Sequence, residues 1–216
     1  MTRRSTFTDQ SVTYGAIGAT LAPDLLRYPP DGYRPAEDSV RLGSGAERFE
    51  RAAESLMTWG IQQGAGFEVV DVSAGTGAQY PGIVYDADGA PLAQQPEPHA
   101  VQRFSSDGTP YITAGVAATL RRRGRLRSAD THVLVVYVID EPGRVGFAYG
   151  TTSDGPESGE ESFILEHRDD DTVWLTIRSL LRARGGLHRL TTPRQRRKRR
   201  ELTTRELRAL HPAFPS

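Results

Sequence analysis

The stretch that most restricts the fold runs from residue 111 to residue 181, where apolar residues recur in segment after segment. Apolar residues at every second position are typical of strands with one buried face. The segments are "YITAGVAATL", "HVLVVYVI", "RVGFAYG", "SFILEH" and "TVWLTIRSLL". The turns between them, such as "EPGR" and "RDDD", contain no helix. Consecutive strands joined in this way predict an antiparallel meander.

Two helices and an early strand flank the meander. Residues 34–42 read as a strand, and "GSGAERFERAAESLMTWGIQQGAG" predicts a helix, with Ser44 and Glu47 at capping-box spacing and a stripe of apolar residues. Thr192 and Pro193 predict the start of a last helix that continues to about Leu210. This order predicts an α+β protein of the helix-grip (START/Bet v 1-like) class, in which a curved antiparallel sheet wraps the long C-terminal helix.

The segment "GRVGFAYGT" suggests where a ligand binds. Gly146, Ala148 and Gly150 leave one face of this strand without bulky side chains. Such a face either admits a closely packed helix or leaves space, so we expect a hollow between the sheet and the last helix. The leading hypothesis is that this cavity binds a small, largely apolar ligand as a partner, oriented by a few polar groups. The polar groups expected there are Tyr149, Glu157, Glu160 and Arg178.

Carboxylates at the same place leave an enzyme as an alternative. Glu157, Glu160 and Glu161 lie at the mouth of a strand, and they would act as acid and base if burial raised the pKa of one of them. The simpler interpretation is a polar hairpin loop with solvated charges. The residue pattern does not decide between the two.

The run "RQRRKRR" leaves a third possibility, binding of a nucleic acid or another anionic surface through the last helix. The contacts would come from Arg196, Arg197, Lys198, Arg199 and Arg200. Against this, the chain has 27 basic and 27 acidic residues, so no overall field favours a polyanion. A solvated or internally paired face is the simpler interpretation of such a run.

Several classes of chemistry are disfavoured. Without cysteine there is no disulfide and no thiolate ligand, and the five histidines show no metal-ligand spacing, so no metal site is expected. "EVVDVSAGTGAQYPG" is similar to the first motif of nucleotide-methyl-donor methyltransferases, but Ser73 stands at the first glycine position and no strand-helix-strand repeat follows, so no cofactor is expected. Without an apolar run long enough to span a membrane, we expect a soluble, cytoplasmic protein.

The segments "YGAIGAT", "LGSGAERFERAAESLMTWG", "GRVGFAYGT", "PESGEESFILEH" and "VWLTIRS" together resemble a bacterial and plant family known as domain of unknown function nineteen-ninety. The resemblance covers residues 14–182 and implies no activity or site residue. Thr152 to Gly155 stand where the family usually has a leucine, a proline and a histidine, which argues against a histidine-dependent activity. We expect one domain over residues 1–216, with an irregular Pro/Gly-rich insertion at 78–110 and a short tail at 211–216.

Overall fold

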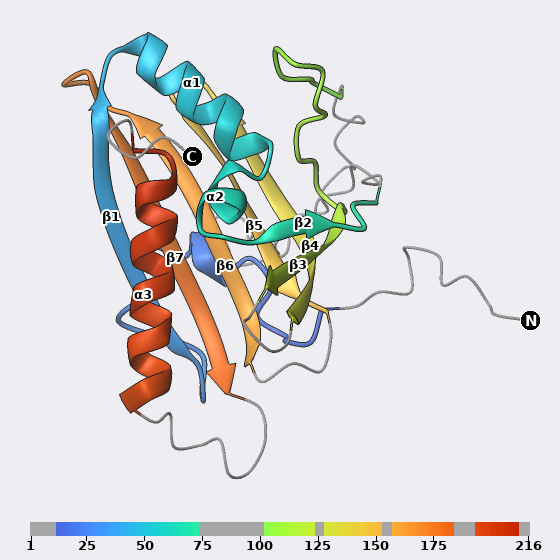
Figure 1. Ribbon diagram of the computed structural model, residues 1–216. Coiled ribbons are helices and arrows are strands. Elements are labelled where there is room, and N and C mark those ends of the chain that lie inside the picture. Colours follow the sequence, from blue (N-terminus) through green and yellow to red (C-terminus); the bar gives the residue numbers. More distant parts are fainter. Residues whose placement is uncertain (1–11, 74–101, 124–127, 153–156, 184–192, 212–216) are drawn as a thin grey trace, which may run out of the picture.

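A seven-stranded antiparallel sheet is the centre of the computed structural model, which describes residues 12–73, 102–123, 128–152, 157–183 and 193–211. The strand order is β1-β7-β6-β5-β4-β3-β2 (Figure 1). Strands β3 to β7 are neighbours in sequence and in space, so the predicted meander is confirmed. The strands are β1 (Arg34–Ser44), β2 (Glu68–Val70), β3 (Ala117–Arg123), β4 (Ser128–Glu141), β5 (Arg144–Thr151), β6 (Glu157–His167) and β7 (Thr172–Ala183).

The last helix is present as predicted, whereas the early helix expected to be continuous is broken in two at Trp59, whose φ of 66° is left-handed. The helices are α1 (Ala46–Met57), α2 (Gly60–Gly64) and α3 (Pro193–Ala209), and a short 3-10 turn, η2 (Ala19–Leu21), precedes the first strand. The expected capping box is wrong, because Ser44 belongs to β1 and no side chain caps the start of α1 at Gly45. The last helix begins at Pro193 as predicted, whereas Thr192 lies outside the described residues.

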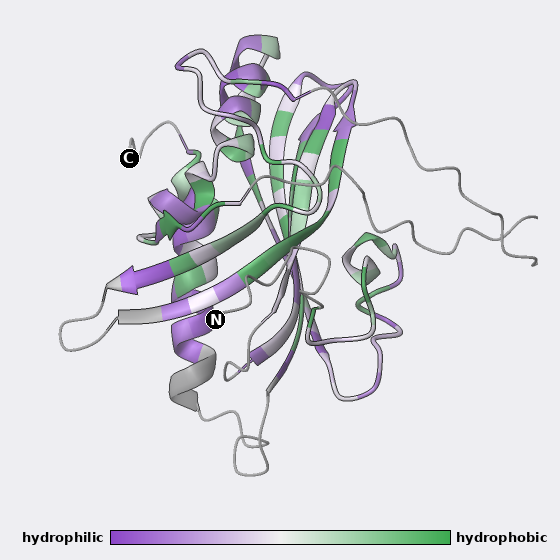
Figure 2. Ribbon diagram, turned by 90° about the vertical axis from the view of Figure 1, so that its right-hand side faces the viewer, coloured by the Kyte–Doolittle hydropathy of each residue, from purple (hydrophilic) through white to green (hydrophobic). Residues whose placement is uncertain are grey.

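The sheet is curved and carries a different layer on each face (Figure 1, Figure 2). One face, here called the helix face, packs Phe147, Phe163 and Leu175 against side chains from the helices, including Leu56 and Leu210. Long α3 lies along this face, so the helix-grip fold is confirmed.

The opposite face, here called the N-terminal face, is covered by the segment that precedes β1. Ala148 and Ile164 belong to a second apolar cluster, against which Val12 and Ile17 pack. A register irregularity in β4 lies beside Val136, which joins this second cluster. The protein therefore has two apolar layers, one on each side of the sheet.

The small residues of β5 lie on the N-terminal face, not beside α3. A Cβ atom at Gly150 would lie 2.4 Å from the hydroxyl oxygen of Tyr14, and Ala148 is fully buried in the N-terminal cluster. On the helix face, β5 instead presents Phe147 and Tyr149, whose rings contact those of Trp59 and Phe163. The expectation that glycines line a hollow under the last helix is therefore wrong. Alternation identifies the residues that share a face, but not the layer that covers it.

The predicted insertion and tail are only partly described. Residues 78–101 and 212–216 lie outside the described residues, and a single bridge pairs Phe104 with Pro110 in the part that follows. The expectation of one domain over the whole chain stays a prediction.

Candidate functional site: a carboxyl-lined cavity between α3 and the sheet

A cavity of about 160 Å³ lies between α3 and the middle of the sheet. Part of its wall is apolar and part carries ionisable groups. The apolar part comes from Phe67, Leu120, Leu181 and Leu202, and the ionisable groups include Tyr149, Glu157, Glu161, Arg199 and Glu206. A cavity with a predominantly apolar wall and a few convergent polar groups is the usual form of a small-molecule site.

The strand register brings two of the polar side chains together. Tyr149 on β5 is directly opposite Glu161 on β6, and its hydroxyl donates a hydrogen bond of 3.1 Å to Glu161 Oε2. From α3, Arg199 donates to the other oxygen of the same carboxylate and forms an ion pair with it. The carboxylate of Glu161 is therefore held from two sides by a phenol and a guanidinium.

Arg199 and Glu206 reach the cavity from the same face of α3. They are seven positions apart, which is close to two helical turns, and Leu202 and Leu210 fall on the same stripe. The side chain of Glu206 is 1% exposed, and its Oε2 atom has no hydrogen-bond partner among the described residues. A buried polar atom without a partner is uncommon in native structures and calls for an explanation.

Burial and the neighbouring Glu161 carboxylate raise the pKa of Glu206 to about 8, although Arg199 and Arg122 counteract the rise. Glu206 is therefore mostly a neutral acid at pH 7. Burial, together with Glu161 and Glu206, also raises the pKa of Tyr149 well above its usual value, so the phenol remains a neutral donor. The cavity thus combines a neutral acid with an ion pair and a phenol.

Among the predicted ligand residues, Tyr149 and Glu157 lie at this cavity. Glu160 also borders it, but its carboxylate points to the N-terminal face, where it accepts four hydrogen bonds. Glu160 Oε2 accepts from the Tyr14 hydroxyl and the Gly18 amide at 2.7 Å each, and Oε1 from the Thr20 amide at 3.0 Å and the Thr20 hydroxyl at 2.5 Å. The oxygens of Glu160 are therefore occupied by the N-terminal segment.

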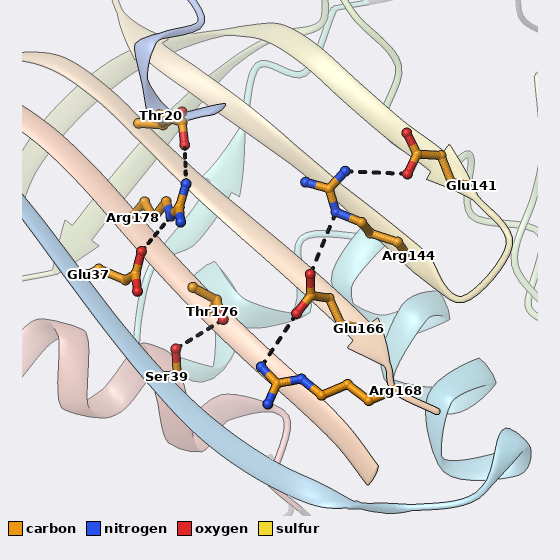
Figure 3. Close-up of polar contacts among 9 residues, drawn as sticks. All are labelled: Thr20, Glu37, Ser39, Glu141, Arg144, Glu166, Arg168, Thr176 and Arg178. Carbon is orange, nitrogen blue, oxygen red and sulfur yellow. Dashed lines mark hydrogen bonds and ion pairs between the residues drawn. The ribbon is translucent and has the colours of Figure 1, made fainter. Parts of the chain in front are cut away.

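Arg178 also lies on the N-terminal face (Figure 3). Its Nε donates to Glu37 at 2.7 Å, and its Nη1 donates to the carbonyls of Thr20 and Ala22 at 3.3 Å each. The structure therefore does not bring Arg178 together with Tyr149. Instead, Arg178 and Glu160 together hold the segment around Thr20 against the sheet.

The basic run at the start of α3 does not form one surface. Arg199 turns into the cavity, whereas Arg197 pairs with Glu201 on the exposed side of the helix at 2.8 Å. Lys198 and Arg200 are exposed, and the side chain of Arg196 lies outside the described residues. Binding of a polyanion by these residues stays a prediction.

A larger hollow of about 980 Å³ lies between α1 and the turn from β4 to β5. Its rim is charged, and the opposite charges are paired, Arg103 with Asp140 and, along α1, Arg51 with Glu47. These four side chains are all more than half exposed. Because such surface pairs stay hydrated, the rim lacks the buried, unpartnered group that marks the cavity under α3.

Neither a metal site nor a membrane-spanning helix is found within the described ranges. No group of three or more histidine, aspartate or glutamate side chains there is placed to hold a metal ion. No helix in that part of the chain has the length and apolar character needed to cross a membrane.

Sequence reasoning did not identify Glu206 as a site residue. The signal that could have found it is its position four residues after Leu202 and four before Leu210, in the stripe that faces the sheet. A glutamate within such a stripe must be buried, paired or protonated. Arg199 lies three residues before Leu202 and was interpreted only as part of the basic run.

Fold and cavity together define a helix-grip protein with a carboxyl-lined pocket under its last helix. The chain belongs to the family described as Domain of unknown function (DUF1990), whose model matches residues 13–96 and 92–209. The resemblance seen in the sequence is thereby confirmed, and the family's description assigns no activity.

A protein of related sequence and two solved structures are similar to this chain. Over 73 residues the chain is 38% identical to a UPF0548 protein of Deinococcus radiodurans, a match that spans 34% of this chain and 36% of that protein. The crystal structure of a hypothetical protein from Helicobacter pylori is similar, with a TM-score of 0.53 and 9% identity over 98% of this chain and all of the other. The structure of Ara h 8.0201 gives a TM-score of 0.49 and 8% identity, covering 83% of this chain and 95% of the other.

Proposed function

We propose that the protein binds a small ligand with an apolar body in the cavity between the sheet and α3. The observation that carries the proposal is the combination of an apolar wall with the buried, unpartnered Oε2 atom of Glu206. A ligand with a polar group could supply the missing hydrogen bond, and its apolar part would pack against Leu120 and Leu202.

The size of the cavity limits the size of the ligand. About 160 Å³ is close to the roughly 150 Å³ of an engineered apolar cavity that binds benzene. A molecule with a single ring is therefore a suitable occupant, whereas a lipid chain would require the helix to move. The rings of Phe147, Phe163 and Trp59 fill the helix face of the sheet beyond this cavity.

The proposal revises the predicted set of ligand residues. Tyr149 and Glu157 remain in it, and Glu161, Arg199 and Glu206 join them. Glu160 and Arg178 support the site from the other face of the sheet, because their polar atoms hold the N-terminal segment.

The test fills the cavity from α3. Leu202→Trp places an indole in the apolar wall, and Thr204→Trp, on the exposed side of the same helix, is the matched control. Isothermal titration calorimetry with benzyl alcohol should show binding to the wild type and to Thr204→Trp, and loss of binding in Leu202→Trp. A folded Leu202→Trp variant that binds as well as the wild type would place the ligand elsewhere. A wild type that binds no single-ring probe at millimolar concentration would refute the proposal.

A further inference from the structure

Carboxyl groups outnumber cations around the cavity. Asp130, Glu157, Glu160, Glu161 and Glu206 line it, against a single arginine, Arg199. Two of these carboxylates are satisfied elsewhere, Asp130 by an ion pair of 3.0 Å with Arg121 and Glu160 by the N-terminal segment. Three carboxyl groups therefore remain, against Arg199 in the wall of the cavity and Arg122 near Glu206.

Arg199 is already committed to the Glu161 carboxylate, which also accepts the Tyr149 hydroxyl. An anionic ligand would have to displace Glu161 from Arg199 and would leave that carboxylate buried beside a second negative charge. Such a loss of a buried partner is strongly unfavourable. A ligand that donates hydrogen bonds and carries a positive charge meets no such competitor, because Glu206 Oε2 has no partner.

We propose that the cavity binds a small organic cation, a primary ammonium group on a single-ring body, with the ammonium nitrogen donating to Glu206. This inference rests on the proposed function and specifies the class of its ligand. The ring would lie against Leu202 and Leu120, in the apolar part of the wall. Glu157, the exposed carboxylate at the rim, would favour entry of a cation over an anion.

Binding of a cation has a consequence for protons. Glu206 is faced by Glu161 from β6, Tyr149 from β5, Arg199 from its own helix and Arg122 from β3. Because its pKa is about 8, it is mostly protonated at pH 7. Formation of a carboxylate–ammonium pair therefore releases one proton from Glu206 to solvent. Affinity for the ammonium should rise with pH, by up to about tenfold per unit below pH 8, and level off above it.

The experiment compares three probes of the same shape: benzylamine, benzyl alcohol and benzoate. Titration calorimetry at pH 8 should show benzylamine binding about tenfold more tightly than benzyl alcohol, because a charge-assisted hydrogen bond is about twice as strong as a neutral one. Benzoate should bind most weakly. At pH 7, buffers with different ionisation enthalpies should report the release of close to one proton with benzylamine and none with benzyl alcohol.

The matched variants are Glu206→Gln and Glu201→Gln, which remove the same group from the buried and the exposed side of α3. Glu206→Gln should lose the preference for benzylamine and the proton release, and Glu201→Gln should keep both.

The outcomes separate the two proposals. Equal affinities for benzylamine and benzyl alcohol, without proton release, would overturn the inference and leave the proposed function standing. If benzoate bound most tightly, the inference would also be overturned and the proposed function would stand, with Arg199 as the group that binds the ligand's charge. Failure of all three probes would refute both proposals. The proton-release measurement uses only the wild type, so the inference stays testable even if Glu206→Gln does not fold.

Discussion

Two glutamates, buried to almost the same extent on opposite faces of the sheet, differ in what surrounds them. Glu160 is 0% exposed and accepts four hydrogen bonds from three residues of the N-terminal segment. Glu206 is 1% exposed, and its Oε2 atom accepts none from the described residues. A carboxylate whose two oxygens are both hydrogen-bonded within the protein stabilises the fold. A carboxyl group with an unpartnered atom beside a cavity is available to a ligand. Burial alone would not distinguish the two roles.

The largest expected effect comes from making the same substitution on each face. Glu160→Gln should lower the free energy of unfolding by about 3 kcal/mol, because an amide lacks the charge and turns an NH₂ group toward donors. Glu206→Gln should not lower it at pH 7, because a similarly shaped amide replaces the neutral acid and, unlike Glu206, does not have to take up a proton on folding. Urea unfolding at pH 7 measures both. Equal losses of unfolding free energy in the two variants would show that Glu160 and Glu206 stabilise the fold to the same extent, contrary to the comparison.

A smaller effect is expected from crowding the N-terminal face. Gly150→Ala should cost about 2 kcal/mol, because the added Cβ would meet the Tyr14 ring. Gly15→Ala is the control, since a Cβ there has no neighbour within 4 Å. Combining Gly150→Ala with Tyr14→Ala should cost less than the sum of the two single changes, as measured in a double-mutant cycle. Strict additivity would mean that Tyr14 does not pack on Gly150 in solution.

The smallest effect, counted per pH unit, is a pH dependence of the free energy of unfolding that arises from Glu206 on the helix face. The folded pKa of Glu206, about 8, lies above its ordinary value of 4.5, so the folded state binds more protons between these values. The contribution of Glu206 to stability is therefore fully present below pH 4.5 and is lost as pH rises toward 8, by up to about 1.4 kcal/mol per unit. Unfolding at pH 5, 6, 7 and 8 should show this fall in the wild type relative to Glu206→Gln. A difference that does not vary with pH would indicate that Glu206 is ionised throughout.

The order of elements could be predicted from the sequence because it depends on local periodicity. Alternation in "RVGFAYG" and "TVWLTIRSLL" identified β5 and β7, and Pro193 marked the start of α3. The segment "YITAGVAATL" was only half right, because β3 begins at Ala117, while Ile112 and Ala114 are buried without belonging to a strand.

The assignment of the faces could not be predicted, because it depends on residues far apart in sequence. Position 150 requires glycine because the ring of Tyr14 packs against it. The irregular segment that carries Tyr14 has no apolar periodicity from which its position could be predicted. For the same reason Glu160 and Arg178 were interpreted as ligand residues, although their partners come from residues 14–37. Strand register pairs Tyr149 with Glu161, and both border the cavity together with Glu157, whereas their role in binding a ligand stays a prediction.

The wide separation between partners also bears on the order of events during synthesis. Thr20 emerges from the ribosome 140 residues before Glu160, and β1 pairs only with β7, which is made later still. Contacts between such distant segments form slowly, because a long loop must close first. Residues 12–44 therefore lack their partners on the sheet while the hairpins from β3 to β6 form. A chaperone would have most to protect in this interval, before the segment docks.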